Sequence, residues 1–276
     1  MKFVFSRKGF DSSYGGHPSP ILPDGTIISL PIPSNDPDKY FLLTNGNKSY
    51  LSIMRELFGD LKDSSGVTIL RKNTRCHLDP DICKGIKPRK SGWRGAFGQI
   101  SSAQQHLENQ GISKGDIFIF FGWFRNTLQT EDGLVYDRQD PRGRHVMFGY
   151  LQVGEIIRHG DKIPAWLFTH PHCDSRRMAD DSNAIYVARK RLSLNPKYSG
   201  YGIFNYTPRH VLTKKGCNRS LWSLPSFFRS IDMSYHSNSK KYGWKKNGFQ
   251  SVAKGQEFVY NGNKQVKNWF LSLLGK

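Results

Sequence analysis

The longest uninterrupted apolar run constrains the fold more than any other feature of this sequence. After Gly115 and Asp116 the chain reads Ile-Phe-Ile-Phe-Phe-Gly-Trp-Phe over residues 117–124. Successive residues of a strand point to opposite faces of a sheet, so a strand of this composition must be covered on both faces. We therefore expect a buried strand at the centre of the fold, with other elements packed on either side.

The segments around this run predict further strands and a few short helices. Alternating or β-branched apolar residues predict strands at 1–6, 26–32, 145–157, 184–192 and 202–206 and near Val211. The polar segment 126–144 contains Asp-Gly and reads as a hairpin excursion. Helical spacing of apolar residues predicts helices at 48–58, 99–110 and 264–274. Strands in the middle with short helices around them indicate the α+β class, with a mixed or antiparallel sheet.

The charge balance is the strongest indication of a partner. The 276 residues include 41 Lys and Arg against 22 Asp and Glu, a formal net charge of +19. From residue 240 onward, eight Lys accompany a single acid, Glu257, and aromatic residues lie among them. Cations that neutralise phosphates, next to rings that stack on bases, favour nucleic acid over a membrane surface. The alternative is a generally basic, solvated surface.

Several classes of protein are excluded by what the sequence lacks. No apolar run approaches the roughly 20 residues that cross a bilayer, and the first seven residues lack the apolar stretch of a signal peptide. We therefore expect a cytoplasmic protein with no membrane partner. P-loop, dinucleotide-binding and zinc-deaminase motifs do not occur. The four cysteines lack paired spacing, which favours buried thiols over a disulfide framework.

The first predicted strand leads into a glycine-rich loop that carries chemically active side chains. Arg7 ends the strand, and Asp11 and Ser12 follow shortly after. Gly15 and Gly16 allow a ligand to approach the backbone closely. Arg7 could contact a phosphate or a base edge, and Asp11 could accept a proton or orient a nucleophile. In the alternative, Asp11 and Ser12 only satisfy backbone N–H groups of a turn.

Two histidine-containing segments are further candidates. On an extended chain His77, Asp79 and Asp81 would face the same way and could form a divalent metal site or a His–Asp acid–base pair. The alternative is an Asx-Pro turn with a surface histidine. His170 and His172 could bind a metal if a third ligand came from elsewhere, or could contact phosphate beside neighbouring arginines. We favour a metal at neither place and leave the cofactor undetermined.

A pair of segments in the centre of the chain resembles a known barrel. Lys114 to Asp116 opens the apolar strand, and the segment Phe148 to Ile156 reads as its neighbour. These segments resemble the core of the pseudouridine-synthase-and-archaeosine-transglycosylase (PUA) barrels, including the EVE and ASCH groups. The resemblance implies a PUA/EVE-like pseudobarrel, whose members often hold nucleic acid or a flipped base. We expect one compact domain over 1–276, with a barrel-like core at about 110–215, an N-terminal motif region at 1–98 and a basic C-terminal segment at 230–276.

A larger set of motifs is spread along the chain. It comprises Ser6 to Ser12, Gly15 to Leu22, Ser29 to Pro33, His77 to Asp81, Phe97 to Gln99 and Phe121 to Arg125. Together these motifs resemble the nucleotide modification associated domain of the third type, a family of phage and bacterial proteins. That family appears beside genes that hypermodify DNA bases. The resemblance spans most of the chain and implies a setting of modified DNA rather than a particular reaction.

We therefore expect a nucleic-acid-binding protein of a DNA base hypermodification system, which modifies a flipped base or nucleotide as a transferase or hydrolase. The expected catalytic residues are Arg7, Asp11, His77 and Asp79. The expected nucleic-acid contacts are Lys8, Phe10, Ser12, Trp93, Arg94, Trp123, Arg125, Arg176, Arg177 and Arg219, with Tyr14 as a further ring for stacking. Two alternatives stay open: a non-catalytic reader of modified bases, and a metal-dependent DNA nuclease with Asp11, His77, Asp79 and Asp81 at the metal. The base, the choice between DNA and RNA, and the oligomeric state are left open by the sequence.

Overall fold

The predicted apolar strand lies near the middle of the main sheet. The structure is a computed structural model that describes residues 1–63, 66–252 and 257–275. Hydrogen-bonded neighbours in the main sheet follow the order β18-β1-β10-β12-β13-β9, while β2 and β11 pair with β10 and β14 pairs with β12. These strands are β1 (Lys2–Arg7), β2 (Ser19–Ile21), β9 (Ala96–Gln99), β10 (Ile117–Thr130), β11 (Gly133–Tyr136), β12 (Arg144–Arg158), β13 (Ala184–Ala188), β14 (Tyr201–Ile203) and β18 (Glu257–Asn261).

The main sheet is mixed, because β1 and β2 run parallel to β10 whereas the other paired strands are antiparallel. β1 and β10 are in register from Phe3 opposite Ile117 to Arg7 opposite Phe121. All five side chains of residues 117–121 have no exposed surface. This burial on both faces is what the apolar run predicted, and it holds the end of β1 against the middle of the sheet.

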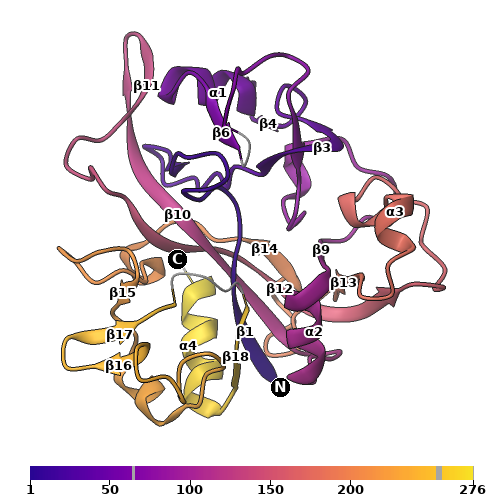
Figure 1. The fold of residues 1–276 in the computed structure, drawn as a ribbon, viewed down its shortest axis with the longest axis vertical. Helices are drawn as coiled ribbons and strands as arrows, with labels where there is room; N and C mark the ends of the chain where they lie inside the picture. The colour runs from indigo at the N-terminus through magenta and orange to yellow at the C-terminus, as the bar shows by residue number, and fades with distance from the viewer. Residues whose placement is uncertain (64–65, 253–256, 276) are drawn as a thin grey trace.

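Four α-helices lie among the described residues, and the longest covers one face of the main sheet. They are α1 (Tyr50–Leu57), α2 (Ser101–Asn109), α3 (Ser175–Met178) and α4 (Lys264–Leu274). Phe270 of α4 packs edge-on against Phe3 and Tyr150, with ring centroids 5.6 and 5.5 Å apart. In Figure 1, α4 lies beside β1 and β18, while α1 and the segments that follow β1 lie at the opposite end of β10.

Smaller sheets and 3-10 turns complete the described part of the chain. The small sheets are formed by β15 (Leu221–Trp222), β16 (Gly243–Lys245) and β17 (Gly248–Gln250); by β3 (Ile32–Lys39) and β8 (Arg75–His77); by β4 (Thr44–Asn45) and β5 (Lys48–Ser49); and by β6 (Leu61–Asp63) and β7 (Gly66–Thr68). The 3-10 turns are η1 (Lys84–Ile86), η2 (Pro171–Cys173), η3 (Pro208–His210) and η4 (Ser226–Ser230).

Three hydrophobic clusters underlie these elements. The largest lies around β1, β10, β12 and α4, and includes Trp222, which is fully buried. A second is formed by the N-terminal segments and α1, and a third lies beneath β13 and the segment that follows β12. Burial of large aromatic side chains contributes most of the stabilisation of such cores.

The α+β class is confirmed, since the described chain is mostly sheet with short helices. The predicted strand at 26–32 is wrong. Thr26 and Ile27 make isolated bridges to two different partners, Asn205 and Ile21, so no ladder forms, and β3 begins only at Ile32. Val211 likewise makes an isolated bridge, to Val146.

The pseudobarrel is not confirmed. Within the residues that the structure describes, the strands form no closed barrel, because β18 and β9 end the main sheet without pairing to each other. All four cysteines, which are among the described residues, are free thiols, but only Cys76 is buried. Lys254 and Lys276 of the predicted basic segment lie outside the described residues. Each described helix is too short or too polar to cross a bilayer.

Candidate functional site

Five segments of the chain converge on one cavity of about 300 Å³. They are the end of β1 with the glycine-rich loop, β3, the end of β8 with its following turn, β9, and the η2–α3 segment. All four expected catalytic residues line this cavity, and Lys8, Tyr14 and Arg177 of the expected binding residues line it with them. We call this space the β1 cavity.

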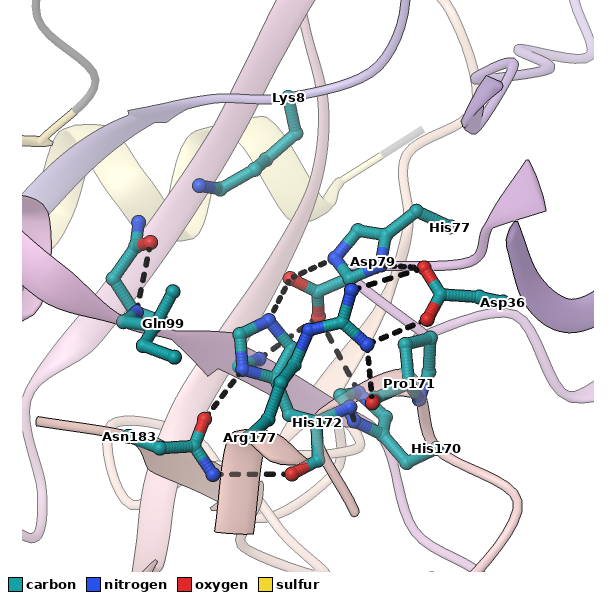
Figure 2. A network of polar contacts seen from close by, with 12 residues as sticks. Lys8, Asp36, His77, Asp79, Gln99, His170, Pro171, His172, Arg177 and Asn183 are labelled. Carbon is teal, nitrogen blue, oxygen red and sulfur yellow. Dashed lines mark hydrogen bonds and ion pairs between the residues drawn. The ribbon is translucent and has the colours of Figure 1, made fainter. Parts of the chain in front are cut away.

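Asp79 lies at the centre of the polar network of the β1 cavity (Figure 2). Its Oδ1 accepts a hydrogen bond of 2.8 Å from the backbone N–H of Gly98 and lies 3.3 Å from Nε2 of His170. Its Oδ2 lies 3.8 Å from Nε2 of His77 and 3.9 Å from Nε2 of His172. Burial raises the pKa of Asp79, but the contact with His170 and the charges of His172 and His77 outweigh burial and lower it to about 2. Asp79 is therefore ionised near neutral pH.

The two histidines that face Oδ2 of Asp79 are each oriented by a hydrogen bond at the other ring nitrogen. Nδ1 of His77 lies 2.8 Å from Oδ2 of Asp36, and Nδ1 of His172 lies 2.7 Å from Oδ1 of Asn183. Burial lowers the pKa of His172 to about 4, against the raising effect of Asp79. His172 is therefore neutral near pH 7, and its free ring nitrogen can act as a base or as a ligand.

Asp36 is shared between His77 and Arg177. Nη1 of Arg177 donates to Oδ1 of Asp36 at 2.5 Å and to the carbonyl of Pro171 at 2.8 Å, while Nη2 donates to Oδ2 of Asp36 at 3.2 Å. Burial raises the pKa of Asp36, but the hydrogen bonds from His77 and Arg177 dominate and hold it well below its usual range. The expected nucleic-acid contact Arg177 thus also has a structural partner inside the cavity wall.

Position 98 must be glycine because β9 packs closely against the ring of His172. A Cβ atom at position 98 would lie 2.1 Å from the His172 ring, far inside van der Waals contact. The same residue donates its N–H to Asp79. Any larger residue here would therefore displace the imidazole.

A second group of expected residues meets at the glycine-rich loop, next to the β1 cavity. Oδ1 of Asp11 accepts the N–H groups of Ser13 and Tyr14, the turn-capping role given above as the alternative. The guanidinium of Arg219 stacks 3.9 Å from the Trp123 ring centroid and donates to Oγ of Ser12 at 3.1 Å. Ser12, Trp123 and Arg219 therefore form one contiguous group, which we call the Trp123 group.

Lys8 and Gln99 are held at the cavity by a buried acid. Nζ of Lys8 and Nε2 of Gln99 donate to the same Oε1 of Glu257, at 2.9 and 2.7 Å. Arg7, beside them on β1, donates to the carbonyl of Val252 at 2.9 Å. Burial lowers the pKa of Arg7, which Asp11 partly offsets.

The remaining expected contacts lie elsewhere. The ring of Phe10 is 1% exposed and packs in the second hydrophobic cluster, so it is not open to a base in this structure. The guanidinium of Arg89 stacks on the Trp93 ring. Arg94 donates a hydrogen bond to the carbonyl of Ala188 and forms an ion pair with Glu155. Arg125 donates to the carbonyl of Asp137 and stacks on Tyr136, whereas the Arg176 side chain is 84% exposed and pairs with Asp174.

The expected convergence of Asp81 with His77 and Asp79 is wrong. The N–H of Asp79 donates to the carbonyl of His77 at 2.9 Å, so the chain turns there instead of continuing extended. Asp81 makes a bridge with Ala96, and its carboxylate forms a buried ion pair with Arg89. It does not line the β1 cavity.

Only one histidine of the His170–His172 pair, His172, meets the other motif in a group that could hold a metal ion. One potential ligand atom from each of His77, Asp79 and His172 lies within 4.8 Å of the other two, a spacing that one metal ion can bridge. Each motif could be found in the sequence, but their proximity could not. The sequence did not indicate Asp36, Asn183 or Glu257, because a lone acid or amide carries no motif, and the Phe97–Gln99 motif did not indicate a site role for Gly98.

The sequence matches one known protein family along most of its length. The model of nucleotide modification associated domain 3 matches residues 2–261. The chain belongs to this family. The match covers every segment that lines the β1 cavity, and the resemblance stated from the motifs is confirmed. No curated protein matches the chain. No solved structure matches it either.

Proposed function

We propose that this member of the family binds nucleic acid and acts on one nucleotide held in the β1 cavity. The observation that carries the proposal is the convergence of Arg7, His77 and Asp79 from separate segments on one space of about 300 Å³. This volume lies at the lower end of small-molecule sites, which span about 300–1,000 Å³, so it suits a single nucleotide rather than a duplex. The family assignment supports a nucleotide as substrate.

The side chains of the cavity supply complementary roles for a flipped nucleotide. The Tyr14 ring, 40% exposed, is available to stack on the base, and Arg7 is placed for a phosphate or base edge. The carboxylate of Asp79 is ionised and the imidazole of His172 is neutral, so both offer lone pairs to polar groups of the nucleotide. Extruding the base costs a few kcal/mol, which stacking and charge contacts must offset.

A larger basic cavity supports a path for the flanking nucleotides. It has a volume of about 1,000 Å³ and is lined by the cationic residues Arg142, Arg144, Arg209, Lys214 and Lys215, with the acids Asp137 and Asp140. Nε1 of Trp123 donates to the carbonyl of Arg142, a residue of the larger cavity, at 3.0 Å. Ser12 of the same Trp123 group follows Asp11, which lines the β1 cavity. A backbone lying in the larger cavity would pass Arg219 on its way to the β1 cavity.

Binding is tested by fluorescence anisotropy with single-stranded and duplex DNA and RNA over a range of salt concentrations. Trp123→Ala should weaken binding by about 1–3 kcal/mol, the typical value of one base stacked on an aromatic ring. Arg219→Ala should weaken binding and reduce the salt dependence by about one counterion. Arg229→Ala is the matched control, because Arg229 stacks on Trp244 in the same way away from both cavities. Equal affinities of all three variants and the unaltered protein would contradict the proposed path.

Chemistry is tested by mass spectrometry of nucleosides from DNA or RNA incubated with the protein and cell extract. An altered nucleoside, absent with Asp79→Asn although binding persists, supports a modifying enzyme. Tight binding with no altered nucleoside identifies the reader. Chain cleavage that stops when a chelator is added identifies the nuclease. The last two outcomes overturn the proposed modification.

A further inference from the structure

Two histidines and one aspartate in the β1 cavity face one another without hydrogen bonding. The Nε2 atoms of His77 and His172 lie 3.8 and 3.9 Å from the same Oδ2 of Asp79, beyond hydrogen-bonding distance. The side chains of His77, His172 and Asp79 are only 16%, 4% and 4% exposed. The three groups therefore meet in the interior and not on the surface, and Figure 2 shows how they face one another.

The partners on the far side of each ring determine which nitrogen carries the proton. The carboxylate of Asp36 accepts from Arg177 and can only accept, so Nδ1 of His77 donates to it. Nδ2 of Asn183 donates to the carbonyl of His172, so its Oδ1 accepts from Nδ1 of that ring. In the neutral rings, both Nε2 lone pairs consequently point toward Asp79. Two nitrogen lone pairs and a carboxylate oxygen this close together repel one another, and a metal cation bound between them would remove that repulsion.

We propose that His77, Asp79 and His172 bind one divalent first-row transition-metal ion, of the Fe²⁺ or Zn²⁺ kind, through two Nε2 atoms and one carboxylate oxygen. Imidazole nitrogens select such ions, whereas Mg²⁺ and Ca²⁺ favour oxygen ligands. Three protein ligands leave coordination positions open, as in catalytic rather than structural sites. The metal-binding inference stands on its own geometry. Its role in catalysis rests on the proposed function, because a nucleotide in the same cavity would reach the open positions.

The distances are close to those of an occupied site. Bonds of about 2.0–2.2 Å from one ion to nitrogen and oxygen place neighbouring ligand atoms roughly 3.0–3.5 Å apart. The observed 3.8 and 3.9 Å are slightly longer than this, and the ligand atoms of all three residues lie within 4.8 Å of one another, so the side chains move inward when an ion binds. Oδ1 of Asp79 is meanwhile held by the N–H of Gly98, which leaves Oδ2 for the ion.

The residues behind the ligands have the arrangement that tunes metal sites. Ligating histidines commonly donate their other N–H to a carboxylate or a carbonyl oxygen, and loss of that partner weakens metal binding by about 10–100-fold. Asp36 serves His77 in this way, and Asn183 serves His172. Nε2 of His170, 3.3 Å from Oδ1 of Asp79, restrains the carboxylate from its other side. Asp36, Asn183 and His170 are therefore positioning residues in this proposal.

The test is metal titration of protein that has been stripped with a chelator, in the absence of nucleic acid. Co²⁺ is added first, because its visible absorption reports nitrogen and oxygen ligands, and Zn²⁺ and anaerobic Fe²⁺ follow in competition. Metal analysis of the protein as isolated distinguishes iron from zinc. We expect one ion per chain, and loss of the Co²⁺ absorption in His77→Ala and His172→Ala. His159→Gln, which removes an exposed histidine, is the matched control and should bind as the unaltered protein does.

Two results would overturn the proposal: an unaltered protein that takes up well below one ion per chain, or His77→Ala and His172→Ala variants that bind as tightly as it does. If these variants fail to fold, Asp36→Asn and Asn183→Ala decide, since the proposal requires 10–100-fold weaker binding in both and unchanged affinity contradicts it. Because nucleic acid is absent, failure here is separate from failure of the anisotropy and nucleoside experiments.

Discussion

Asp79 acquires its chemical character from four neighbours that come from other parts of the chain. Gly98 donates a backbone N–H to one oxygen, His170 lies close to the same oxygen, and His77 and His172 face the other. These contacts outweigh burial and keep the pKa of Asp79 at about 2, so the side chain is ionised near neutral pH. At the scale of single residues, the site is built by hydrogen bonds that orient each polar atom.

The packing of Gly98 on His172 leads to the first prediction. Gly98→Ala should displace the His172 ring, because the new Cβ would lie 2.1 Å from it. We expect metal binding at least tenfold weaker and a loss of stability of about 1–3 kcal/mol from overpacking. Co²⁺ titration and urea unfolding measure the two effects. Gly59→Ala, where nothing lies within 4 Å of the added Cβ, should change neither; unchanged metal affinity in Gly98→Ala would show that His172 is not a ligand.

The second prediction is that Asp81 contributes to the stability of the fold and not to metal binding. Asp81 and Arg89 form a buried ion pair with two contacts of 2.5 Å and side chains 6% and 7% exposed. Arg89→Met should destabilise the fold by about 3–5 kcal/mol, because it leaves an uncompensated carboxylate. Adding Asp81→Leu to that variant should restore most of the stability without affecting metal binding. Urea unfolding of the single and double variants tests this, and a double variant as unstable as the single one would contradict it.

At the scale of elements, short irregular segments position the site while long regular ones support it. Asp36 lies where β3 departs from register with β8, between Pro33 and Asp38, and such irregularities often direct a side chain into a site. His172 lies on the 3-10 turn η2, and Arg177 lies on the one-turn helix α3. These elements have few internal hydrogen bonds of their own, so they depend on packing against β9 and on the polar network.

The third prediction concerns the element that covers the main sheet. Phe270 of α4 has no exposed surface and contacts rings on β1 and β12. Phe270→Ala should therefore lower the free energy of unfolding by about 3–5 kcal/mol. Asn268→Ala, on the exposed face of the same helix, should change it by less than about 0.5 kcal/mol. Urea unfolding followed by circular dichroism makes the comparison, and a small effect of Phe270→Ala would show that α4 is not docked as described.

At the scale of the whole molecule, the β1 cavity lies where the three hydrophobic clusters meet. Leu78, next to His77, belongs to the N-terminal cluster, and Phe97, next to Gly98, belongs to the main one. Cys173, next to His172, packs against the third cluster. A residue of each cluster is thus followed or preceded in the sequence by a residue that lines the β1 cavity: His77, Gly98 or His172. Sites at such junctions are common because independently packed units leave a space between them.

The fourth prediction is a loss of stability in mild acid. Burial lowers the pKa of His236 to about 4, and burial also lowers the pKa of His145 well below its ordinary value. The unfolded chain therefore binds more protons than the folded one below about pH 6.5, and stability falls as the pH drops from there toward 4. His236 alone should account for about 2 kcal/mol between pH 7 and pH 5.

Urea unfolding at pH 7 and pH 5 measures this loss. His236→Gln should reduce the difference between the two pH values even though it lowers stability at both, because it removes the hydrogen bond from the N–H of Val252. The exposed His159→Gln is the control. A pH difference as large in His236→Gln as in the unaltered protein would contradict the assignment.

Local patterns predicted the elements well and the site in part. The helix at 264–274 was placed correctly because helical spacing of Val266, Phe270 and Leu273 reflects burial of one face. The strand at 26–32 failed because β propensity cannot create a partner strand. His77 and Asp79 were selected, but Asp81 was added on the assumption of an extended chain, and the turn at Asp79 breaks that alternation.

The amino-acid sequence alone determined the buried central strand, the helices, the basic charge and the family, because each depends on residue types at short or fixed spacing. The tertiary structure decided that the two histidine motifs belong to one site, that Asp36 and Asn183 orient them, and that Phe10 and Asp81 lie outside it. The reason is physical: which distant segments meet depends on how the sheet and its three clusters pack, and no local spacing encodes that contact.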